Sequence, residues 1–279
     1  MKPFRPKKQR KEYDRDDYHS MPRKKKKFGQ HFLRNHAVVD HMIERVVITD
    51  KTPVIEIGCG DGFLTKEILT KTPCKQLWSY EIDYDWAAYV QDHIIDKRLT
   101  VIEKNILEEN WETALSPDAP WVMLANLPYQ VTFPILFFVK AHKHLFSEGV
   151  VMVQEEVAQK IVAQSGKQFS PTTMLLQYHF TWELLDKVPP SYFVPPPKVT
   201  SRLLYFKPKL DQKPIPDEEQ FWKFVKACFR SPRQTLKNNL RTTHYLDQQI
   251  FDDSKLSLRA QQFTFNDFLT LWLDFLAKK

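Results

Sequence analysis

The sequence predicts an α/β fold, in which a largely parallel sheet is covered by helices on both faces and is followed by a small helical domain. Short apolar runs alternate with segments long enough to hold helices from residue 54 to residue 154. After Pro216 the apolar residues follow helical spacing instead. The 279 residues are 42% hydrophobic and 27% charged, so the chain can bury a sizeable core and is not disordered throughout.

Five strands of the parallel sheet are predicted first, and two more complete it. The five apolar runs cover residues 54–58, 76–81, 99–102, 121–125 and 149–154. Two further runs, at 174–185 and 201–206, are joined by the proline-rich stretch 188–197 and not by an obvious helix. This connection predicts an antiparallel pair of strands at one edge of the sheet.

The helical region begins after a proline-marked boundary near residues 208–216. Its apolar residues recur at helical spacing, for example at Phe221, Phe224, Val225 and Cys228. We therefore predict three parts: a basic, disordered arm at 1–27, an α/β domain at 28–210 and a helical domain at 211–279.

Charge is distributed unevenly along the chain. The net charge is +8 over residues 1–27, −8 over 28–186 and +7 over 187–279. A basic arm and a basic C-terminal third are typical of a protein that grips a polyanion, although a solubilising tail and a solvated basic face would leave the same pattern. The arm contains four acidic residues and one serine, which argues against a mitochondrial transit peptide.

The sequence argues against a membrane protein, a disulfide-stabilised protein and a metal-binding protein. The longest apolar stretch, at 131–139, contains a proline and is much shorter than the ~20 residues that span a bilayer. No signal peptide is recognised, so a cytoplasmic location is expected. The three cysteines show no paired C-x-x-C spacing, which argues against a disulfide framework or a structural zinc site, and no metal ligand is predicted.

A glycine-rich loop is the first candidate for ligand binding. Gly58, Gly60 and Gly62 are three of only six glycines in the chain, and they follow the first predicted strand. A helix is expected to begin near Phe63. Glycine lets the backbone turn tightly and approach a ligand, while the first turn of a helix offers free N–H groups. The spacing G-x-G-x-G is shorter than that of nicotinamide and flavin binders.

An acidic residue completes this pattern. Glu81 ends the second predicted strand about 20 residues after the loop, where a carboxylate can accept hydrogen bonds from both hydroxyls of a ribose. Strand, loop, helix and acid in this order indicate a nucleoside ligand, against the alternative of a turn that serves packing alone. Glu56 lies inside the first strand, where a carboxylate needs a partner, and we expect a ligand amino group or neighbouring backbone to supply it.

The fourth predicted strand runs into Asn126-Leu127-Pro128-Tyr129. The side-chain oxygen of Asn126 and the carbonyl of Leu127 can together grip an exocyclic amine, since Pro128 restricts Leu127 to extended geometry. Tyr129 would then stack on the base. Two acceptors would orient the amine for in-line attack on an electrophile, largely by positioning. The alternative is an ordinary turn with a buried tyrosine.

These motifs resemble, in order, those of the small-subunit ribosomal RNA adenine N6,N6-dimethyltransferases, the kasugamycin-sensitivity methyltransferases. The resemblance covers roughly residues 24 to 275. The matching segments are 27–33, the loop around Gly58, 81–83, 126–129, 154–158, 193–199 and 230–240.

The resemblance implies a Rossmann-like, seven-stranded S-adenosylmethionine-dependent methyltransferase domain and a small helical domain that contacts RNA. It implies transfer of methyl groups from S-adenosylmethionine to N6 of two adjacent adenosines near the 3′ end of small-subunit rRNA, during ribosome biogenesis. The partner would be the small ribosomal subunit or its precursor. Nothing in the sequence indicates an obligate interface, so a monomer is expected.

Site residues are also implied by position. His31 and Leu33 would line the cofactor, and Asn126 would touch both the cofactor and the target base. Tyr129 and Phe193 would sandwich a flipped adenine. The implied cofactor-binding residues are His31, Leu33, Gly58, Gly60, Glu81, Ile82, Asn105 and Asn126. The implied catalytic residues are Asn126, Leu127, Pro128, Tyr129 and Phe193.

Two departures from the family pattern bear on these roles. Asn105 stands where the family usually has an aspartate that contacts the adenine amino group, so the affinity for the cofactor is expected to differ. The paired arginines of the helical domain are spread as Arg230 and Arg233.

Two alternatives remain at this stage: a large-subunit rRNA methyltransferase of the antibiotic-resistance type, and a catalytically idle RNA-binding assembly factor. The glycine spacing disfavours a nicotinamide-dependent oxidoreductase.

Overall fold

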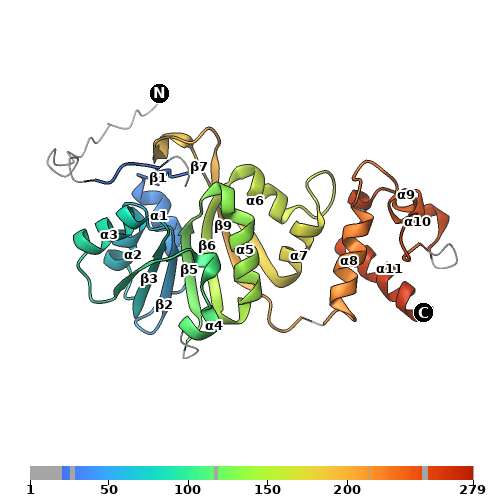
Figure 1. The fold of residues 1–279 in the computed structure, drawn as a ribbon, viewed down its shortest axis with the longest axis horizontal. Coiled ribbons are helices and arrows are strands. Elements are labelled where there is room, and N and C mark those ends of the chain that lie inside the picture. Colours follow the sequence, from blue (N-terminus) through green and yellow to red (C-terminus); the bar gives the residue numbers. More distant parts are fainter. Residues whose placement is uncertain (1–20, 26–28, 116–118, 213, 247–250, 279) are drawn as a thin grey trace, which may run out of the picture.

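A seven-stranded sheet forms the centre of the computed structural model, which describes residues 21–25, 29–115, 119–212, 214–246 and 251–278 (Figure 1). The strand order is β4-β3-β2-β5-β6-β9-β7. The strands are β2 (Pro53–Ile57), β3 (Gln76–Glu81), β4 (Leu99–Glu103), β5 (Trp121–Asn126), β6 (Phe146–Gln154), β7 (Phe180–Val188) and β9 (Ser201–Pro208). The predicted α/β class and seven-stranded sheet are confirmed.

Strand β9 runs against both of its neighbours in this sheet. The pairs from β4 to β6 are all parallel, whereas β9 is antiparallel to β6 and to β7. The predicted antiparallel pair at the sheet edge is thus confirmed. The last residue of β7 pairs with the first residue of β9, and this residue also pairs with the last residue of β6. The connection between β7 and β9 therefore lies at the edge of the sheet formed by the carboxyl ends of the parallel strands. This connection contains β8 (Phe193–Val194), which pairs with β1 (Phe32–Leu33) in a separate two-stranded sheet.

Helices cover both faces of the sheet. The first group is α1 (His36–Glu44), α2 (Phe63–Lys71), α3 (Tyr84–His93), α4 (Trp111–Ala114), α5 (Thr132–Ala141), α6 (Glu155–Val162) and α7 (Pro171–His179). Successive strand residues face different cores, because side chains alternate along a strand. Val54 packs in the core covered by α1 and α2, and Ile55 packs in the core covered by α5, α6 and α7.

The predicted strand at 174–185 is wrong in its first half. Residues up to His179 belong to α7, and β7 begins only at Phe180. Ser170 begins the helix, because its side chain and that of Thr173 exchange hydrogen bonds with each other's backbone N–H groups. Pro171 follows at the first helical position, where its missing N–H costs nothing. These start signals were present in the sequence and outweigh the apolar run.

The C-terminal helices pack around their own core. They are α8 (Glu218–Cys228), α9 (Leu236–Leu240), α10 (Asp253–Leu256) and α11 (Phe265–Ala277). The predicted helical face of α8 is confirmed, since Phe221, Phe224, Val225 and Cys228 are all buried. The same core includes Met174 of α7, which joins the helices to the α/β part. Figure 1 shows α8 to α11 at the opposite end of the molecule from α3.

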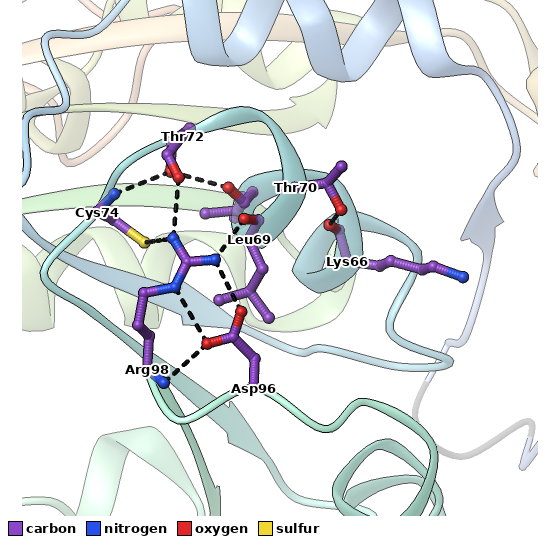
Figure 2. A network of polar contacts seen from close by, with 8 residues as sticks. Lys66, Leu69, Thr70, Thr72, Cys74, Asp96 and Arg98 are labelled. Atoms are coloured by element: carbon purple, nitrogen blue, oxygen red, sulfur yellow. Dashed lines mark hydrogen bonds and ion pairs between the residues drawn. The ribbon is translucent and has the colours of Figure 1, made fainter.

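Arg98 ties the end of α2 to the start of β4 (Figure 2). Its guanidinium donates to the carbonyls of Leu69 and Thr72 and forms an ion pair with Asp96 at 2.7 Å. The last carbonyls of a helix have no partner within the helix, and a cation at this end is favourable. Arg98 therefore fixes the helix that begins at the glycine loop.

Candidate functional site

A cavity of about 240 Å³ opens at the carboxyl ends of the parallel strands. Ligands of open α/β sheets bind at this edge. Most of the predicted site residues line the cavity: His31, Leu33, Gly58, Gly60, Glu81, Ile82, Asn105, Asn126, Leu127, Pro128 and Tyr129. Sequence reasoning did not single out other lining residues, among them Gln30, Phe32, Tyr80 and Lys104. Gln30 and Phe32 lie within the matching segment 27–33, and Tyr80 and Lys104 are each adjacent to a predicted site residue.

The glycine loop adopts backbone that other residues rarely adopt. Gly58, Gly60 and Gly62 have φ angles of +77°, +54° and +79°. A Cβ on Gly60 would lie 2.7 Å from the Phe32 ring, so a side chain there would collide with Phe32, which also lines the cavity. Helix α2 begins at Phe63, as predicted. The loop therefore presents bare backbone and the first turn of a helix to the cavity.

Glu81 is held at the end of β3 by two backbone groups. Its Oε2 accepts from the N–H of Gly60 and its Oε1 from the N–H of Asp83, each at 2.9 Å. The residue is only 6% exposed, and burial raises the pKa of its carboxyl. Each oxygen keeps acceptor capacity for a further bond, as contact with two ribose hydroxyls requires.

Glu56 does not line the cavity. Its Oε2 accepts from the hydroxyls of Thr65, at 2.7 Å, and Ser79. The expectation that a ligand amino group or backbone would satisfy this carboxyl is therefore wrong, because two side-chain hydroxyls from α2 and β3 do so. Complete burial is the main cause that raises the pKa of Glu56 to about 7. Its other oxygen, Oε1, is buried without a hydrogen-bond partner among the described residues.

Asn105 lies on the cavity wall beyond the end of β4. Its Oδ1 accepts from the N–H of Leu107 at 3.2 Å, and its Nδ2 donates to Oε1 of Glu108 at 2.8 Å. These two bonds fix which end of the amide carries the oxygen. Lys104, the preceding lining residue, pairs with Glu109 at 2.9 Å.

Asn126 and Tyr129 are both fixed by hydrogen bonds. The Nδ2 of Asn126, at the end of β5, donates to the carbonyl of His31 at 3.1 Å. The hydroxyl of Tyr129 lies 2.6 Å from that of Ser201, and burial raises the pKa of the phenol. Leu127 donates its N–H to Met152 at 3.1 Å, which continues the pairing of β5 with β6. The predicted tetrapeptide is therefore held on the cavity wall.

Residues 29–33, here termed the N-terminal segment, form another wall of the cavity. The segment is attached at several points: Gln30 donates to Asp83 at 3.0 Å, and Lys25, just before it, pairs with Asp83 at 2.5 Å. At its far end Arg34 pairs with Asp61 of the glycine loop. Sequence reasoning assigned no role to these two aspartates, although Asp61 lies in the glycine loop and Asp83 in the matching segment 81–83. Most of the predicted arm, at 1–20 and 26–27, lies outside the described residues.

Phe193 is the one residue of the implied catalytic and cofactor-binding sets that does not line the cavity. It is 2% exposed and packs in the core beneath α1 and α2, because its strand pairs with β1 and sets Phe193 opposite Leu33. The ring stacked on Tyr129 is that of His31, with centroids 5.9 Å apart. Phe193 therefore supports the N-terminal segment through the strand pairing that sets it opposite Leu33.

Two kinds of feature are absent from the described residues. No helix among them has both the length and the apolar character to cross a bilayer. Likewise, the described part of the chain has no group of three or more His, Cys, Asp or Glu residues placed to hold a metal ion.

Residues 21–270 match the family model described as "Ribosomal RNA adenine dimethylase". The chain belongs to this family. Among curated relatives, it is 38% identical to "Ribosomal RNA small subunit methyltransferase A" of Syntrophotalea carbinolica over 78% of this chain and 82% of that one. The protein of the same name from Alcanivorax borkumensis is 31% identical over 89% of each chain.

Two solved structures share the fold of this chain. A dimethyladenosine transferase from Plasmodium falciparum is 25% identical, with a TM-score of 0.74, over 89% of this chain and 98% of that one. The 23S rRNA methyltransferase ErmE has a TM-score of 0.65 at 22% identity, over 88% and 99% of the two chains. The second likeness shows the fold alone.

S-adenosylmethionine is the methyl donor of the dimethylase family. The residues of this chain fit it. The glycine loop presents bare backbone at Gly58, where a Cβ would have no described neighbour within 4 Å, and the buried Glu81 carboxylate is fixed with acceptor capacity to spare. Both features are what a nucleoside with a charged tail requires.

Proposed function

We propose that this protein transfers methyl groups from S-adenosylmethionine to N6 of two adjacent adenosines near the 3′ end of small-subunit rRNA. The observation that carries the proposal is the amide of Asn126. Because its Nδ2 donates to the His31 carbonyl, its Oδ1 is the end left to accept a bond from an exocyclic amine. The relatives named small subunit methyltransferase A support the small-subunit substrate over the large-subunit alternative.

Each wall of the cavity has a role in this proposal. Glu81 would hold the ribose of the cofactor, with the glycine loop near its methionine end and Asn105 near its adenine. Asn126 and the Leu127 carbonyl would orient the target amine, and Tyr129 would stack on the base. The bound cofactor supplies an activated methyl group on a sulfonium, so the protein needs no strong general base and acts by positioning. The methylated amine loses its proton to water.

The C-terminal region would hold the RNA. We propose that residues 28–210 form the catalytic domain and residues 211–279 an RNA-contacting domain, helped by the basic arm at 1–27. We also propose that the protein acts as a monomer. With ribosomal RNA as substrate, the proposal places the protein in the cytoplasm.

Methyl transfer to undermethylated small ribosomal subunits tests the proposal. Labelled S-adenosylmethionine is supplied, the rRNA is digested to nucleosides and the products are identified by mass. Dimethyladenosine at two adjacent sites is expected from the wild-type chain. Asn126→Ala should abolish transfer, while Asn110→Ala, at an exposed asparagine whose side chain makes no capping bond at the start of α4, should not change it. Transfer to large-subunit RNA alone, or to neither, would overturn the proposal.

A further inference from the structure

His31 contacts three residues at once. Its backbone carbonyl accepts from Nδ2 of Asn126 at 3.1 Å. Its imidazole stacks on Tyr129, with centroids 5.9 Å apart and planes 24° apart. The Nδ1 atom lies 2.8 Å from the carbonyl oxygen of Pro195. These contacts join the N-terminal segment, the catalytic tetrapeptide and the turn after β8.

The hydrogen bond to Pro195 requires that Nδ1 of the imidazole be the donor. A carbonyl oxygen can only accept, so Nδ1 must carry the proton and donate it. The bond therefore holds the ring in one orientation against Tyr129. It also fixes the position of the residue and, with it, the carbonyl that Asn126 uses.

The orientation of the Asn126 amide depends on this carbonyl. An amide that rotated by 180° would present its NH₂ group to the target, and a donor cannot accept the amine proton. With His31 in place, the NH₂ group has an acceptor on the wall of the cavity, and rotation would set Oδ1 against the His31 carbonyl oxygen. Two acceptors facing each other are unfavourable, so the productive orientation is the stable one.

The surroundings of His31 limit its freedom to move. Strand β1 follows it directly and pairs Phe32 with Val194 and Leu33 with Phe193. On the other side, Lys24 donates to the carbonyl of Val194 at 3.0 Å. Residues before and after His31 in the sequence are therefore both bound to β8, which holds His31 in place.

We propose that His31 is a positioning residue for methyl transfer, setting the amide of Asn126 and the ring of Tyr129 in place, a role additional to lining the cofactor cavity. This inference rests on the proposed function and deepens it. Misplacement of reacting groups by about 1 Å can cost on the order of a hundredfold in rate. Loss of the imidazole should therefore lower kcat and leave cofactor binding nearly unchanged.

Three substitutions separate the contacts of the imidazole. His31→Ala removes both, His31→Phe keeps a ring against Tyr129 without the donor, and His31→Gln keeps a donor for Pro195 without the ring. The expected kcat of His31→Ala is roughly tenfold to hundredfold below wild type. The kcat values of His31→Phe and His31→Gln should lie between those of His31→Ala and wild type. The Kd for S-adenosylmethionine, measured by calorimetry, should change less than about threefold.

His93→Ala is the matched control. His93 also stacks on a tyrosine, Tyr89, at 4.1 Å and its Nδ1 lies 2.8 Å from a carbonyl oxygen, but it is exposed and outside the cavity. This variant should keep wild-type kcat.

The outcomes distinguish the inference from the proposed function. Wild-type kcat in His31→Ala, with an active wild-type chain, would overturn the inference alone. A loss of activity matched by an equal loss of cofactor affinity would also overturn it, because His31 would then act only through the cofactor. If His31→Ala has a lowered melting midpoint, the His31→Phe and His31→Gln variants test the inference instead. Wild-type kcat in both of these variants would overturn it. An inactive wild-type chain would overturn the proposed function and the inference with it.

Discussion

The backbone N–H of Gly60 donates to Oε2 of Glu81 at 2.9 Å, which joins the glycine loop to the end of β3. The second oxygen of Glu81 is occupied by the N–H of Asp83. Both oxygens therefore act as acceptors before any ligand binds. A side chain with one acceptor and one donor cannot make both bonds.

Glu81→Gln should weaken cofactor binding by roughly tenfold or more, because its NH₂ group must face either the Gly60 or the Asp83 N–H. Calorimetric titration with S-adenosylmethionine measures the effect. Glu103→Gln is the control, since Glu103 pairs with Glu81 in register across β3 and β4 but is exposed and does not line the cavity. Equal affinities for the two variants would contradict the assignment of Glu81 to the cofactor site.

Gly60→Ala should destabilise the protein by more than Gly166→Ala. Both glycines have positive φ angles, +54° and +80°, so alanine is strained at either by about 1–2 kcal/mol. Only at Gly60 does the new Cβ meet a neighbour, 2.7 Å away on the Phe32 ring, whereas no described atom lies within 4 Å of it at Gly166. Urea unfolding of the two variants measures the difference. A Gly166→Ala variant as unstable as Gly60→Ala would rule out the steric explanation.

Asn105→Asp should leave the affinity for S-adenosylmethionine within about threefold of wild type, despite restoring the acidic residue usual in the family. The reason is Glu108, which accepts from Asn105 Nδ2 at 2.8 Å and would face a second carboxylate. In the double variant Asn105→Asp, Glu108→Gln the repulsion is gone, and binding should tighten by roughly threefold to tenfold over wild type. A double variant no tighter than Asn105→Asp would show that Glu108 does not matter.

Glu56 should make stability depend on pH. Burial raises its pKa to about 7, from 4.5 for the free group. Between these values the folded chain binds more protons than the unfolded chain, so the contribution of Glu56 to stability falls as pH rises. The difference in unfolding free energy between wild type and Glu56→Gln should shift against the wild type by on the order of 2–3 kcal/mol from pH 4.5 to pH 7.5.

Glu155→Gln provides the control for this experiment. The hydrogen bond from Arg202 lowers the pKa of Glu155 to about 2, so the stability that it contributes is complete above pH 4.5 and is lost only as pH falls towards 2. Its difference from wild type should therefore be constant from pH 5 to 8. Urea unfolding across this range checks both variants, and a constant difference for Glu56→Gln would contradict the raised pKa.

RNA binding should depend steeply on salt, and less so when Arg233 and Arg241 are replaced by Gln. Both are exposed on the C-terminal helical part. Removing one cation from a phosphate of the RNA should lower the slope of log K against log salt by about 0.7 for single strands. Filter binding to a small-subunit rRNA fragment at several salt concentrations measures this. Lys223→Gln, whose lysine is already paired with Glu219 at 2.6 Å, should keep the wild-type slope, and an equal change in both would contradict a specific RNA face.

Much of the fold was predictable because the strands are short apolar runs bounded by clear turns. Glu81 and Asn126 lie at strand ends, where the sequence predicts them, and both reach the cavity. The start of α7 was missed because the apolar run through Met174 masked the capping signal at Ser170. A periodic pattern reports burial, and residues buried on a short helix resemble those of a strand.

The site was less predictable where it depends on contacts between distant segments. The burial of Phe193 follows from the pairing of β8 with β1, which joins residues 160 positions or more apart, for example Leu33 and Phe193. No local pattern encodes this pairing. The roles of Asp61 and Asp83 were missed for the same reason, because their partners Arg34 and Lys25 lie far away in the sequence.

The pairing of β1 with β8 also sets an order of events for a chain emerging from the ribosome. Strands β2 to β6 can form from the first 154 residues, yet the wall of the cavity that contains His31 is completed only when Val194 and Pro195 are in place. Contacts so distant in sequence form late, after the local ones. A partly synthesised chain therefore lacks a finished cavity until residue 195 has been made and β8 has paired with β1.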